Sequence, residues 1–254
     1  MQTQDFDCKV ALVTGGSSGI GRATALAFAA RGARVVVASR REAESAETVS
    51  QIRAAGGQAL FVATDVTRSA EVQALVARTV AHFGALDCAF NNAGIEGKPF
   101  VAAADVDEAT WDQVLAVNLT GVFLCMKYQL PHLLARRGAI VNMASVAGLT
   151  GGRSMGVAYH ASKFGVVGLT RAAALEYAES GVRINAVAPA VIHTPMAERA
   201  FMQDEKIAAR LKGLHPMGRI GQPDEVAQAV LWLCSDAASF TTGHVLPVDG
   251  GLLT

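Results

Sequence analysis

Short runs of β-branched and other apolar residues alternate along the chain with longer stretches in which apolar residues recur every three or four positions. The longer stretches, such as 21–32 and 69–84, predict helices that pack one face on a sheet and stop at Gly32 and Gly84. The short runs are apolar throughout, so they predict strands that are buried on both faces, as in a parallel sheet. Seven such strands are expected, at 9–14, 33–39, 58–64, 86–91, 138–145, 181–188 and 244–249.

This order of elements indicates an α/β fold, with a doubly wound sheet of about seven mostly parallel strands and helices on both faces. The sequence has no repeat, low-complexity tract or linker, so residues 1–254 are expected to form a single domain. The segment 190–222 interrupts the alternation between the sixth strand and the helix before the seventh. An insertion there lies at the carboxyl end of the sheet, where ligands of such folds bind. We therefore predict a substrate lid at 190–222 and call it the lid segment.

Charge and cysteine usage narrow the function. The 22 basic and 22 acidic residues balance and are interspersed, which argues against nucleic acid or a membrane surface as partner and favours a small molecule. The cysteines at 8, 88, 125 and 234 form no CxxC pair and have no histidine at metal-ligand spacing, so neither a disulfide framework nor a metal site is expected. No signal-like start and no run of about 18 apolar residues is found, and we expect a cytoplasmic protein.

A glycine-rich turn follows the first predicted strand and opens directly into the first helix. Its sequence, TGGSSGIG at 14–21, places Gly15, Gly19 and Gly21 where the chain must turn sharply. Backbone N–H groups at such a helix start can hold a pyrophosphate, because glycine permits close approach and the helix dipole favours negative charge. A plain tight turn is the alternative. The position at the first strand-to-helix junction favours dinucleotide binding and a Rossmann-like sheet.

The end of the second strand carries information about the cofactor. Dinucleotide folds usually have an acidic residue there that binds the adenosine ribose, but this chain has Ser39 followed by Arg40 and Arg41. Two guanidinium groups without a carboxylate suit a 2′-phosphate, so NADP(H) is favoured over NAD(H). The alternative is that both arginines are solvated at a helix start. Ser18 stands where a basic residue would add a second phosphate contact.

Tyr159 and Lys163 are the strongest candidates for proton chemistry. If 157–178 is helical, the two side chains lie on one face, and the ammonium would lower the pKa of the phenol toward working pH. A phenol with such a pKa is suited to general acid/base catalysis, whereas an ordinary surface pair is the alternative. Ser145 ends the fifth strand at the same rim and could hold a substrate carbonyl. Asn118 is a polar residue in an apolar helical stretch, and a buried amide needs partners.

Several motifs together resemble those of the short-chain dehydrogenase/reductase family, in its common, roughly 250-residue branch. They are TGGSSGIG (14–21), Asp65-Val66, NNAG (91–94), Asn118, Ser145, Tyr159-x3-Lys163 and the segment from Pro189 to Thr194. The resemblance implies that Tyr159 passes the proton, that Lys163 lowers its pKa and binds the nicotinamide ribose, and that Ser145 orients the substrate. It also implies that Asn118 holds a water that leads protons from Lys163 to solvent.

The cofactor contacts follow from the same resemblance together with the glycine turn and the arginines. The expected set is Gly15, Ser17, Ser18, Gly19, Ile20, Gly21, Arg40, Arg41, Asp65, Val66, Asn92, Ala93, Gly94, Tyr159, Lys163, Pro189, Ile192 and Thr194. Two features depart from the family pattern. Ala190 replaces the usual glycine after Pro189, and the interval from Ser145 to Tyr159 is one residue longer than the commonest spacing.

The expected activity is reversible hydride transfer between NADP(H) and a secondary alcohol or its ketone. The alternatives are an NAD(H)-dependent sugar or polyol dehydrogenase of the same family and, from a different class, a non-catalytic dinucleotide-binding module. Candidate substrate contacts are mixed in character: glycines and aliphatic residues suit an apolar ketone, whereas Glu96, Arg153 and His193 could recognise hydroxyls or a carboxylate. They come from Ile95, Glu96, 147–157, Val191, His193 and 195–216.

Two predicted helices, 110–135 and 157–178, carry more apolar residues than one sheet-facing stripe requires. The surplus is available for burial between subunits. The family resemblance implies a homotetramer that uses these helices in one interface and the helix at 224–236 with the final strand in another.

Overall fold

The computed structural model describes residues 5–152 and 154–254 and contains a seven-stranded sheet in which every pair of neighbouring strands is parallel. The strand order is β3-β2-β1-β4-β5-β6-β7, so the order reverses between β1 and β4 as in other doubly wound sheets. All seven strands predicted from the apolar runs are confirmed to within two residues at either end. Their bounds are β1 Val10–Thr14, β2 Arg34–Ser39, β3 Ala59–Ala63, β4 Cys88–Asn91, β5 Ala139–Met143, β6 Arg183–Pro189 and β7 Val245–Val248.

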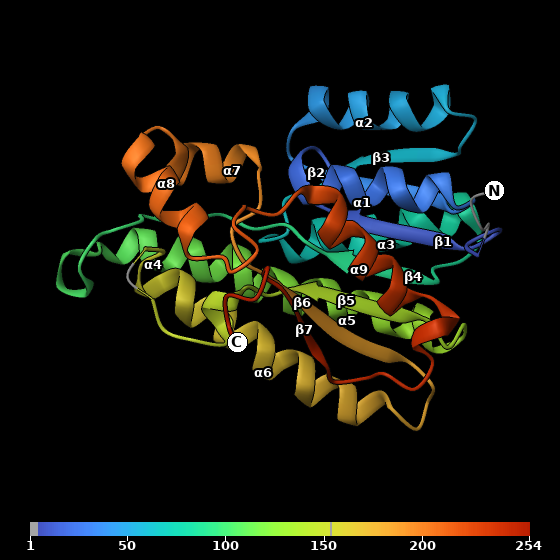
Figure 1. The fold of residues 1–254 in the computed structure, drawn as a ribbon. Helices are drawn as coiled ribbons and strands as arrows, with labels where there is room; N and C mark the ends of the chain where they lie inside the picture. Colours follow the sequence, from blue (N-terminus) through green and yellow to red (C-terminus); the bar gives the residue numbers. More distant parts are fainter. Residues whose placement is uncertain (1–4, 153) are drawn as a thin grey trace.

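Helices cover both faces of the sheet because each strand is apolar on both sides. In β1, Val10 and Leu12 enter one core cluster while Ala11 and Val13 enter the other. The first cluster is covered by α3 (Ser69–Phe83), α5 (Gly121–Leu134) and α6 (Val157–Tyr177). The second is covered by α1 (Gly19–Ala30), α2 (Glu42–Ala54) and α9 (Pro223–Cys234), and these layers are visible in Figure 1.

The stretch expected to be helical at 110–135 is one long helix with a π-helical turn in its middle. It consists of α4 (Glu108–Leu115), η2 (Ala116–Thr120) and α5. By length and composition alone, Glu108–Leu134 is the one helix among the described residues that could cross a membrane. Half of its most apolar 18-residue window is buried, and α5 packs against α3 and the sheet, as expected for the core helix of an α/β fold. The cytoplasmic location stays a prediction.

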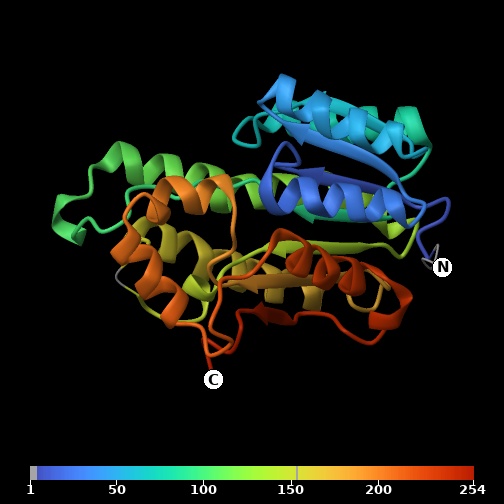
Figure 2. The same ribbon diagram turned by 45° about the horizontal axis from the view of Figure 1, so that its top comes forward.

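The lid segment is largely helical. It contains α7 (Pro195–Ala197), the π-helical turn η4 (Glu198–Met202) and α8 (Glu205–Gly213), which share a small apolar cluster around Phe201 and Leu211. Its two ends are joined by a bridge in which His193 N–H donates to Gly221 O at 2.9 Å and Gly221 N–H to Val191 O at 3.0 Å. In Figures 1 and 2 this orange segment lies at the end of the sheet away from the N-terminus.

The remaining short elements are the 3₁₀ turns η1 (Ala103–Asp105), η3 (Val146–Gly148) and η5 (Asp236–Ala238).

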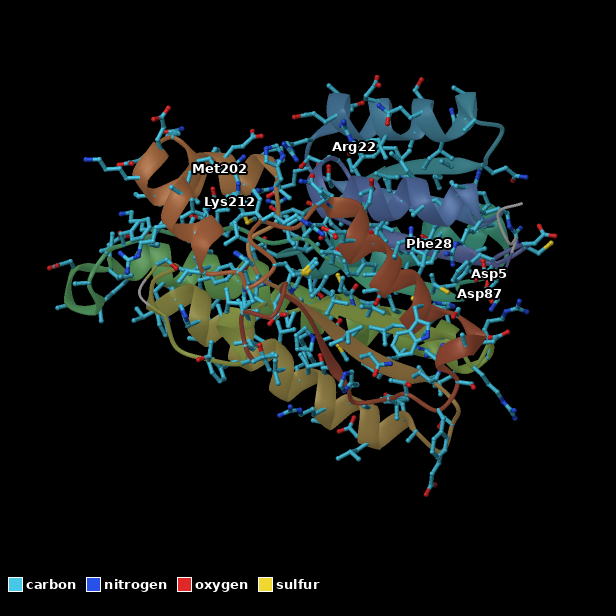
Figure 3. The ribbon with its side chains drawn as sticks, in the orientation of Figure 1. Asp5, Arg22, Phe28, Asp87, Met202 and Lys212 are labelled. Atoms are coloured by element: carbon cyan, nitrogen blue, oxygen red, sulfur yellow. The ribbon has the colours of Figure 1, made fainter. Side chains whose placement is uncertain are left out.

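Different residues lie at the two ends of the sheet. Figure 3 labels Met202 and Lys212 on the lid segment at one end and Asp5 and Asp87 at the other. At that second end Asp87 accepts hydrogen bonds from Val10 N–H and Arg136 Nε, at 2.9 and 2.8 Å.

A buried polar network connects the central strands to the helices beneath them. Asn91 Nδ2 donates to Gln129 Oε1 at 3.1 Å and to Asn142 Oδ1 at 3.0 Å, and Gln129 Nε2 returns a bond to Asn91 Oδ1 at 2.8 Å. Asn142 Nδ2 in turn donates to Thr170 Oγ1 at 3.0 Å. Since buried amides without partners are costly, this network fixes β4 and β5 against α5 and α6. Asn91, the first residue of the NNAG motif, therefore has a structural role.

Candidate active site

A cleft of about 1020 Å³ lies at the carboxyl end of the sheet, between the strand ends and the lid segment. The structure brings nearly all of the predicted site residues to its walls. Of the predicted catalytic residues, Ser145, Tyr159 and Lys163 line it, and Asn118 does not. The predicted cofactor contacts line it without exception: Gly15, Ser17, Ser18, Gly19, Ile20, Gly21, Arg40, Arg41, Asp65, Val66, Asn92, Ala93, Gly94, Tyr159, Lys163, Pro189, Ile192 and Thr194.

The glycine-rich turn forms the floor of the cleft at the start of α1. A Cβ atom on Gly21 would lie 2.3 Å from the carbonyl oxygen of Gly15, and Gly15 itself has a φ of +66°. Only glycine permits this approach. Arg22 Nη2 donates to Ser17 O at 2.7 Å and Glu44 O at 3.1 Å, which ties the turn to α2 (Figure 3). The first turn of α1 has no acidic residue, so the helix start and the cleft together fit a dinucleotide pyrophosphate.

Arg41 is held over the glycine-rich turn. Its guanidinium donates to the Ser17 hydroxyl from Nε at 3.2 Å and from Nη2 at 2.8 Å, and Nη2 also reaches the Ser18 hydroxyl. Arg40 is more exposed and lies 4.0 Å from the Asp65 carboxylate. The interpretation that both arginines are merely solvated is therefore wrong for Arg41. The sequence could not show its contact with Ser17, because the two residues lie on different loops.

Tyr159 and Lys163 lie together on the cleft-facing side of α6. Lys163 Nζ is 5.4 Å from the centre of the Tyr159 ring and donates to Met143 O at 2.8 Å. Lys163 is buried, with 3 % of its surface exposed, while Tyr159 is partly open to the cleft. Burial lowers the pKa of Lys163 from 10.5 to about 7.

The prediction that Lys163 lowers the pKa of the Tyr159 phenol is not supported. Burial raises the pKa of Tyr159 to about 12, the Ser145 hydroxyl opposes this rise, and the negative charge of Glu96 adds to it. Because the same burial favours the neutral form of Lys163, the ammonium does not supply the expected compensation. The two groups are correctly paired in space, but burial shifts the pKa of each toward its neutral form.

Ser145 and Asn118 differ in their access to the cleft. The Ser145 hydroxyl accepts from Ala147 N–H at 3.2 Å and lies 3.4 Å from Pro189 O, at the cleft wall. Asn118 is fully buried in η2: its Oδ1 accepts from Ile95 N–H at 2.8 Å, and its Nδ2 donates to Ile95 O at 2.9 Å and to Ser162 Oγ at 3.3 Å. Its side chain therefore holds the loop after β4 against α6, and its hydrogen bonds go to Ile95 and Ser162.

The substrate half of the cleft is mainly apolar. Ile95, Glu96 and Val191 line it as expected, whereas His193 lies outside it with Nε2 3.8 Å from Glu198. Arg153 lies outside the described residues. Phe100 and Leu252 line the cleft but were missed, because neither stands near a recognisable motif. The residues of the predicted ranges 147–157 and 195–216 that line the cleft are Ala147, Thr150, Gly151, Gly152, Ser154, Met155, Pro195, Met196, Ala197, Arg199, Phe201, Ile207, Arg210, Leu211 and Leu214.

Within residues 5–152 and 154–254, no group of three or more His, Cys, Asp or Glu side chains is placed to hold a metal ion. A glycine cradle at a switch point in the strand order, next to a tyrosine and a lysine, is typical of oxidoreductases that use nicotinamide dinucleotides.

Comparison with known proteins identifies the family within this class of oxidoreductases. A family model described as enoyl-(acyl carrier protein) reductase matches residues 15–253.

Individual relatives agree with that match. The chain is 47 % identical over 251 residues to a 2,5-dichloro-2,5-cyclohexadiene-1,4-diol dehydrogenase of Sphingobium indicum, covering 97 % of this chain and 98 % of the relative. It is 45 % identical over 251 residues to a cyclohexanol dehydrogenase of an Acinetobacter species, covering 98 % and 97 %. The crystal structure of levodione reductase superposes with a TM-score of 0.92 at 40 % identity, covering 97 % and 98 %.

This chain belongs to the short-chain dehydrogenase/reductase family. It is an oxidoreductase of CH–OH groups that transfers hydride between a nicotinamide cofactor and a secondary alcohol or its ketone. A non-catalytic binding module, the alternative from a different class, is thereby set aside.

Proposed function

We propose that the enzyme uses NADP(H) to interconvert a six-membered carbocyclic secondary alcohol and its ketone. The observation that carries the proposal is the placement of Ser145, Tyr159 and Lys163 on one wall of the cleft whose floor is the glycine-rich turn. The ring chemistry is supported by two relatives whose names refer to a cyclohexadiene diol and to cyclohexanol. The apolar lining of the substrate half suits such a ring, because few of its side chains would need polar partners.

The preference for NADP(H) rests on Arg41. Its guanidinium lies beside the Ser17 and Ser18 hydroxyls at the edge of the glycine-rich turn, where a 2′-phosphate of a bound dinucleotide would meet three donors. The absence of a carboxylate at Ser39 removes the usual partner of a free ribose hydroxyl. The pyrophosphate would lie at the start of α1, and Asp65 with Val66 would contact the adenine.

In the mechanism we propose, the protein's side chains align the substrate and move one proton. In reduction, the Tyr159 hydroxyl donates its proton to the carbonyl oxygen while that oxygen accepts a hydrogen bond from Ser145. In oxidation the tyrosinate removes the alcohol proton. When bound, the oxidised cofactor supplies the hydride-accepting pyridinium ring and its positive charge. Lys163 would bind the ribose hydroxyls of the cofactor, and burial lowers its pKa to about 7, so that it can exchange protons near neutral pH.

The water relay that the family resemblance assigns to Asn118 must use the backbone at this position. Both polar atoms of its side chain are already bound to Ile95 and Ser162. A π-helical turn such as η2 leaves backbone groups outside the regular α-helical pattern, and such turns are frequent at functional sites. We propose that Asn118 shapes the cleft through Ile95, and that any relayed water is held by the backbone of η2.

The decisive experiment measures nicotinamide absorbance with four cofactors, NADP+, NADPH, NAD+ and NADH, against matched ring and open-chain substrates. We expect cyclohexanol and cyclohexanone to react faster than 2-hexanol and 2-hexanone, and NADP(H) to give a higher kcat/KM than NAD(H). Tyr159→Phe keeps the ring but removes the proton, so we expect turnover to fall about 10²–10⁴-fold. Full turnover by Tyr159→Phe would exclude the mechanism, and preference for a sugar or polyol would favour the alternative substrate class.

We also propose that the enzyme is a homotetramer. Large apolar side chains are exposed on the helices expected at one interface, including Phe123 on α5 and Phe164 and Leu175 on α6, with Leu175 81 % exposed. Trp232 on α9 and Phe240 near β7 are exposed on the elements expected at the other. Light scattering should give four times the chain mass, and a stable monomer at micromolar concentration would contradict the proposal.

A further inference from the structure

The lid segment touches the loop that follows β4 at two points above the cleft. Arg199 approaches the Glu96 carboxylate with both nitrogens of one edge, Nε to Oε1 at 3.2 Å and Nη2 to Oε2 at 3.5 Å. Phe201 meets Phe100 edge-on, with ring centres 5.9 Å apart and an angle of 86°. Both lid residues belong to η4, so one π-helical turn carries the ionic and the aromatic contact.

Glu96 is an acidic residue in a cleft wall whose substrate half is mainly apolar. Its side chain is only 18 % exposed and lines the same cleft as Tyr159, whereas Arg199 is 57 % exposed. A partly buried carboxylate without a partner is unfavourable, and Arg199 provides the partner across the cleft. Burial is the main cause of the raised pKa of Tyr159, and the hydrogen bond with Ser145 opposes it. The negative charge of Glu96 is a third, smaller cause, and it raises this pKa further.

We propose that Glu96 is a positioning residue of the reaction, that its charge acts on Tyr159, and that Arg199 compensates this charge only while the lid segment is in the position seen here. This inference rests on the proposed role of Tyr159 as the proton-transfer group. Lid position and proton transfer are then coupled. With Arg199 in place the tyrosinate needed for alcohol oxidation is less disfavoured, and without it the uncompensated carboxylate opposes that anion.

Other charged or titratable groups face the same space, and a pH effect must be separated from theirs. Lys163 and His160 belong to α6 on either side of Tyr159, and Arg210 of α8 lines the cleft with Arg199. Further along the loop, Lys98 is paired with Asp107. The design below therefore changes Glu96 and Arg199 singly and together, so that these common neighbours cancel in the comparison.

The test is the pH dependence of kcat/KM for alcohol oxidation, which rises as Tyr159 loses its proton. Glu96→Gln removes the opposing charge, so we expect the midpoint of the rise to move to lower pH. Arg199→Gln exposes the charge, so the midpoint moves up. In Glu96→Gln/Arg199→Gln both charges of the pair are removed, so the two shifts should largely cancel and the midpoint should return close to that of the wild type, because the effects of the two charges on Tyr159 add. Arg199→Lys should restore most of the wild-type profile.

Two controls separate electrostatics from loosening of the lid segment. Phe201→Leu weakens the aromatic contact without changing any charge, so KM is expected to change while the midpoint does not. The second readout is an ultraviolet difference titration of tyrosinate in the cofactor-free protein, with Tyr159→Phe as the blank. Glu96→Gln should titrate at lower pH than wild type in this measurement as well.

The proposal is overturned if Glu96→Gln leaves both midpoints unchanged, or if the double variant Glu96→Gln/Arg199→Gln keeps the full upward shift of Arg199→Gln. A midpoint shift in Phe201→Leu as large as that in Arg199→Gln would also overturn it, because lid loosening alone would then explain the data. Failure of the proposed function looks different: Tyr159→Phe would retain turnover, whatever the behaviour of Glu96→Gln.

Discussion

Replacing Lys163 by methionine is expected to stabilise the ligand-free protein while it abolishes turnover. Methionine matches the length of the lysine stem and suits the apolar surroundings, but it carries no charge. In the wild type the ammonium is buried beside Tyr159, with only its bond to Met143 O at 2.8 Å to replace water. Because burial disfavours the charged form, it lowers the pKa of Lys163 to about 7.

The size of the effect follows from that pKa. A fall from 10.5 to about 7 corresponds to a cost of about 5 kcal/mol for folding with a charged Lys163 at low pH. Methionine removes this cost but also loses the hydrogen bond to Met143 O and leaves that carbonyl unpaired, a loss of about 2–3 kcal/mol. The difference predicts a gain of about 2 kcal/mol in the free energy of unfolding at neutral pH.

The pH dependence distinguishes this explanation from a general packing effect. The folded-state pKa of Lys163 is below the unfolded value, so between about 7 and 10.5 the unfolded chain binds more protons than the native one. Wild-type stability therefore gains about 1.4 kcal/mol per pH unit in this window relative to Lys163→Met. The advantage of the variant is largest at pH 7 and below, and the two stabilities should cross at about pH 9.

The assay is urea unfolding of the cofactor-free proteins at one protein concentration, because any subunit association also contributes to stability. Lys212→Met is a matched control, since Lys212 is exposed on α8 (Figure 3) and its replacement should change stability by less than about 0.5 kcal/mol at every pH. A Lys163→Met variant that is less stable than wild type by a pH-independent amount would refute the reasoning. It would mean that the ammonium is solvated in the native protein.

Three further substitutions test other parts of the structure. Arg41→Ala should raise KM for NADPH about 10–100-fold in steady-state kinetics and leave KM for NADH nearly unchanged, because only the 2′-phosphate loses a charge-assisted contact; equal effects on both cofactors would contradict the assignment. Gly21→Ala places a Cβ 2.3 Å from Gly15 O, so thermal unfolding should show a loss of about 1–3 kcal/mol together with weaker cofactor binding in a fluorescence titration. Gln129→Ala leaves Asn91 without two bonds and should cost about 2–4 kcal/mol in urea unfolding without changing KM, whereas a change in KM alone would point to the cleft instead.

The strands and most cleft residues could be predicted because they depend on local patterns. A strand covered on both faces must be apolar throughout. A polar residue that comes just after such a strand, as Ser145 comes after β5, must lie at the rim of the sheet. The glycine turn is equally local, since Gly15 and Gly21 meet each other six residues apart. The residues of these features can therefore be assigned to the site without any knowledge of how distant segments pack.

Contacts between distant segments were not predictable in this way. Glu96 and Arg199 are 103 positions apart, and nothing near either residue indicates the other. His193 was expected in the substrate pocket from its place after Val191, but the bridge to Gly221 directs it toward Glu198. The direction of the Tyr159 pKa was also missed, because it depends on how deeply the surrounding loops bury the pair, whereas the helical spacing shows only that the pair exists.

Burial of the site has opposite consequences for cofactor chemistry and for proton chemistry. Hydride transfer benefits from a dry cleft, and the apolar lining around Phe201 and Leu211 provides one. The same apolar surroundings raise the pKa of Tyr159 and lower that of Lys163, so they oppose the charged form of both proton-transfer groups. Oxidation therefore needs groups whose charge favours the tyrosinate. Arg199, positioned by η4 against Glu96, is such a group within the chain itself.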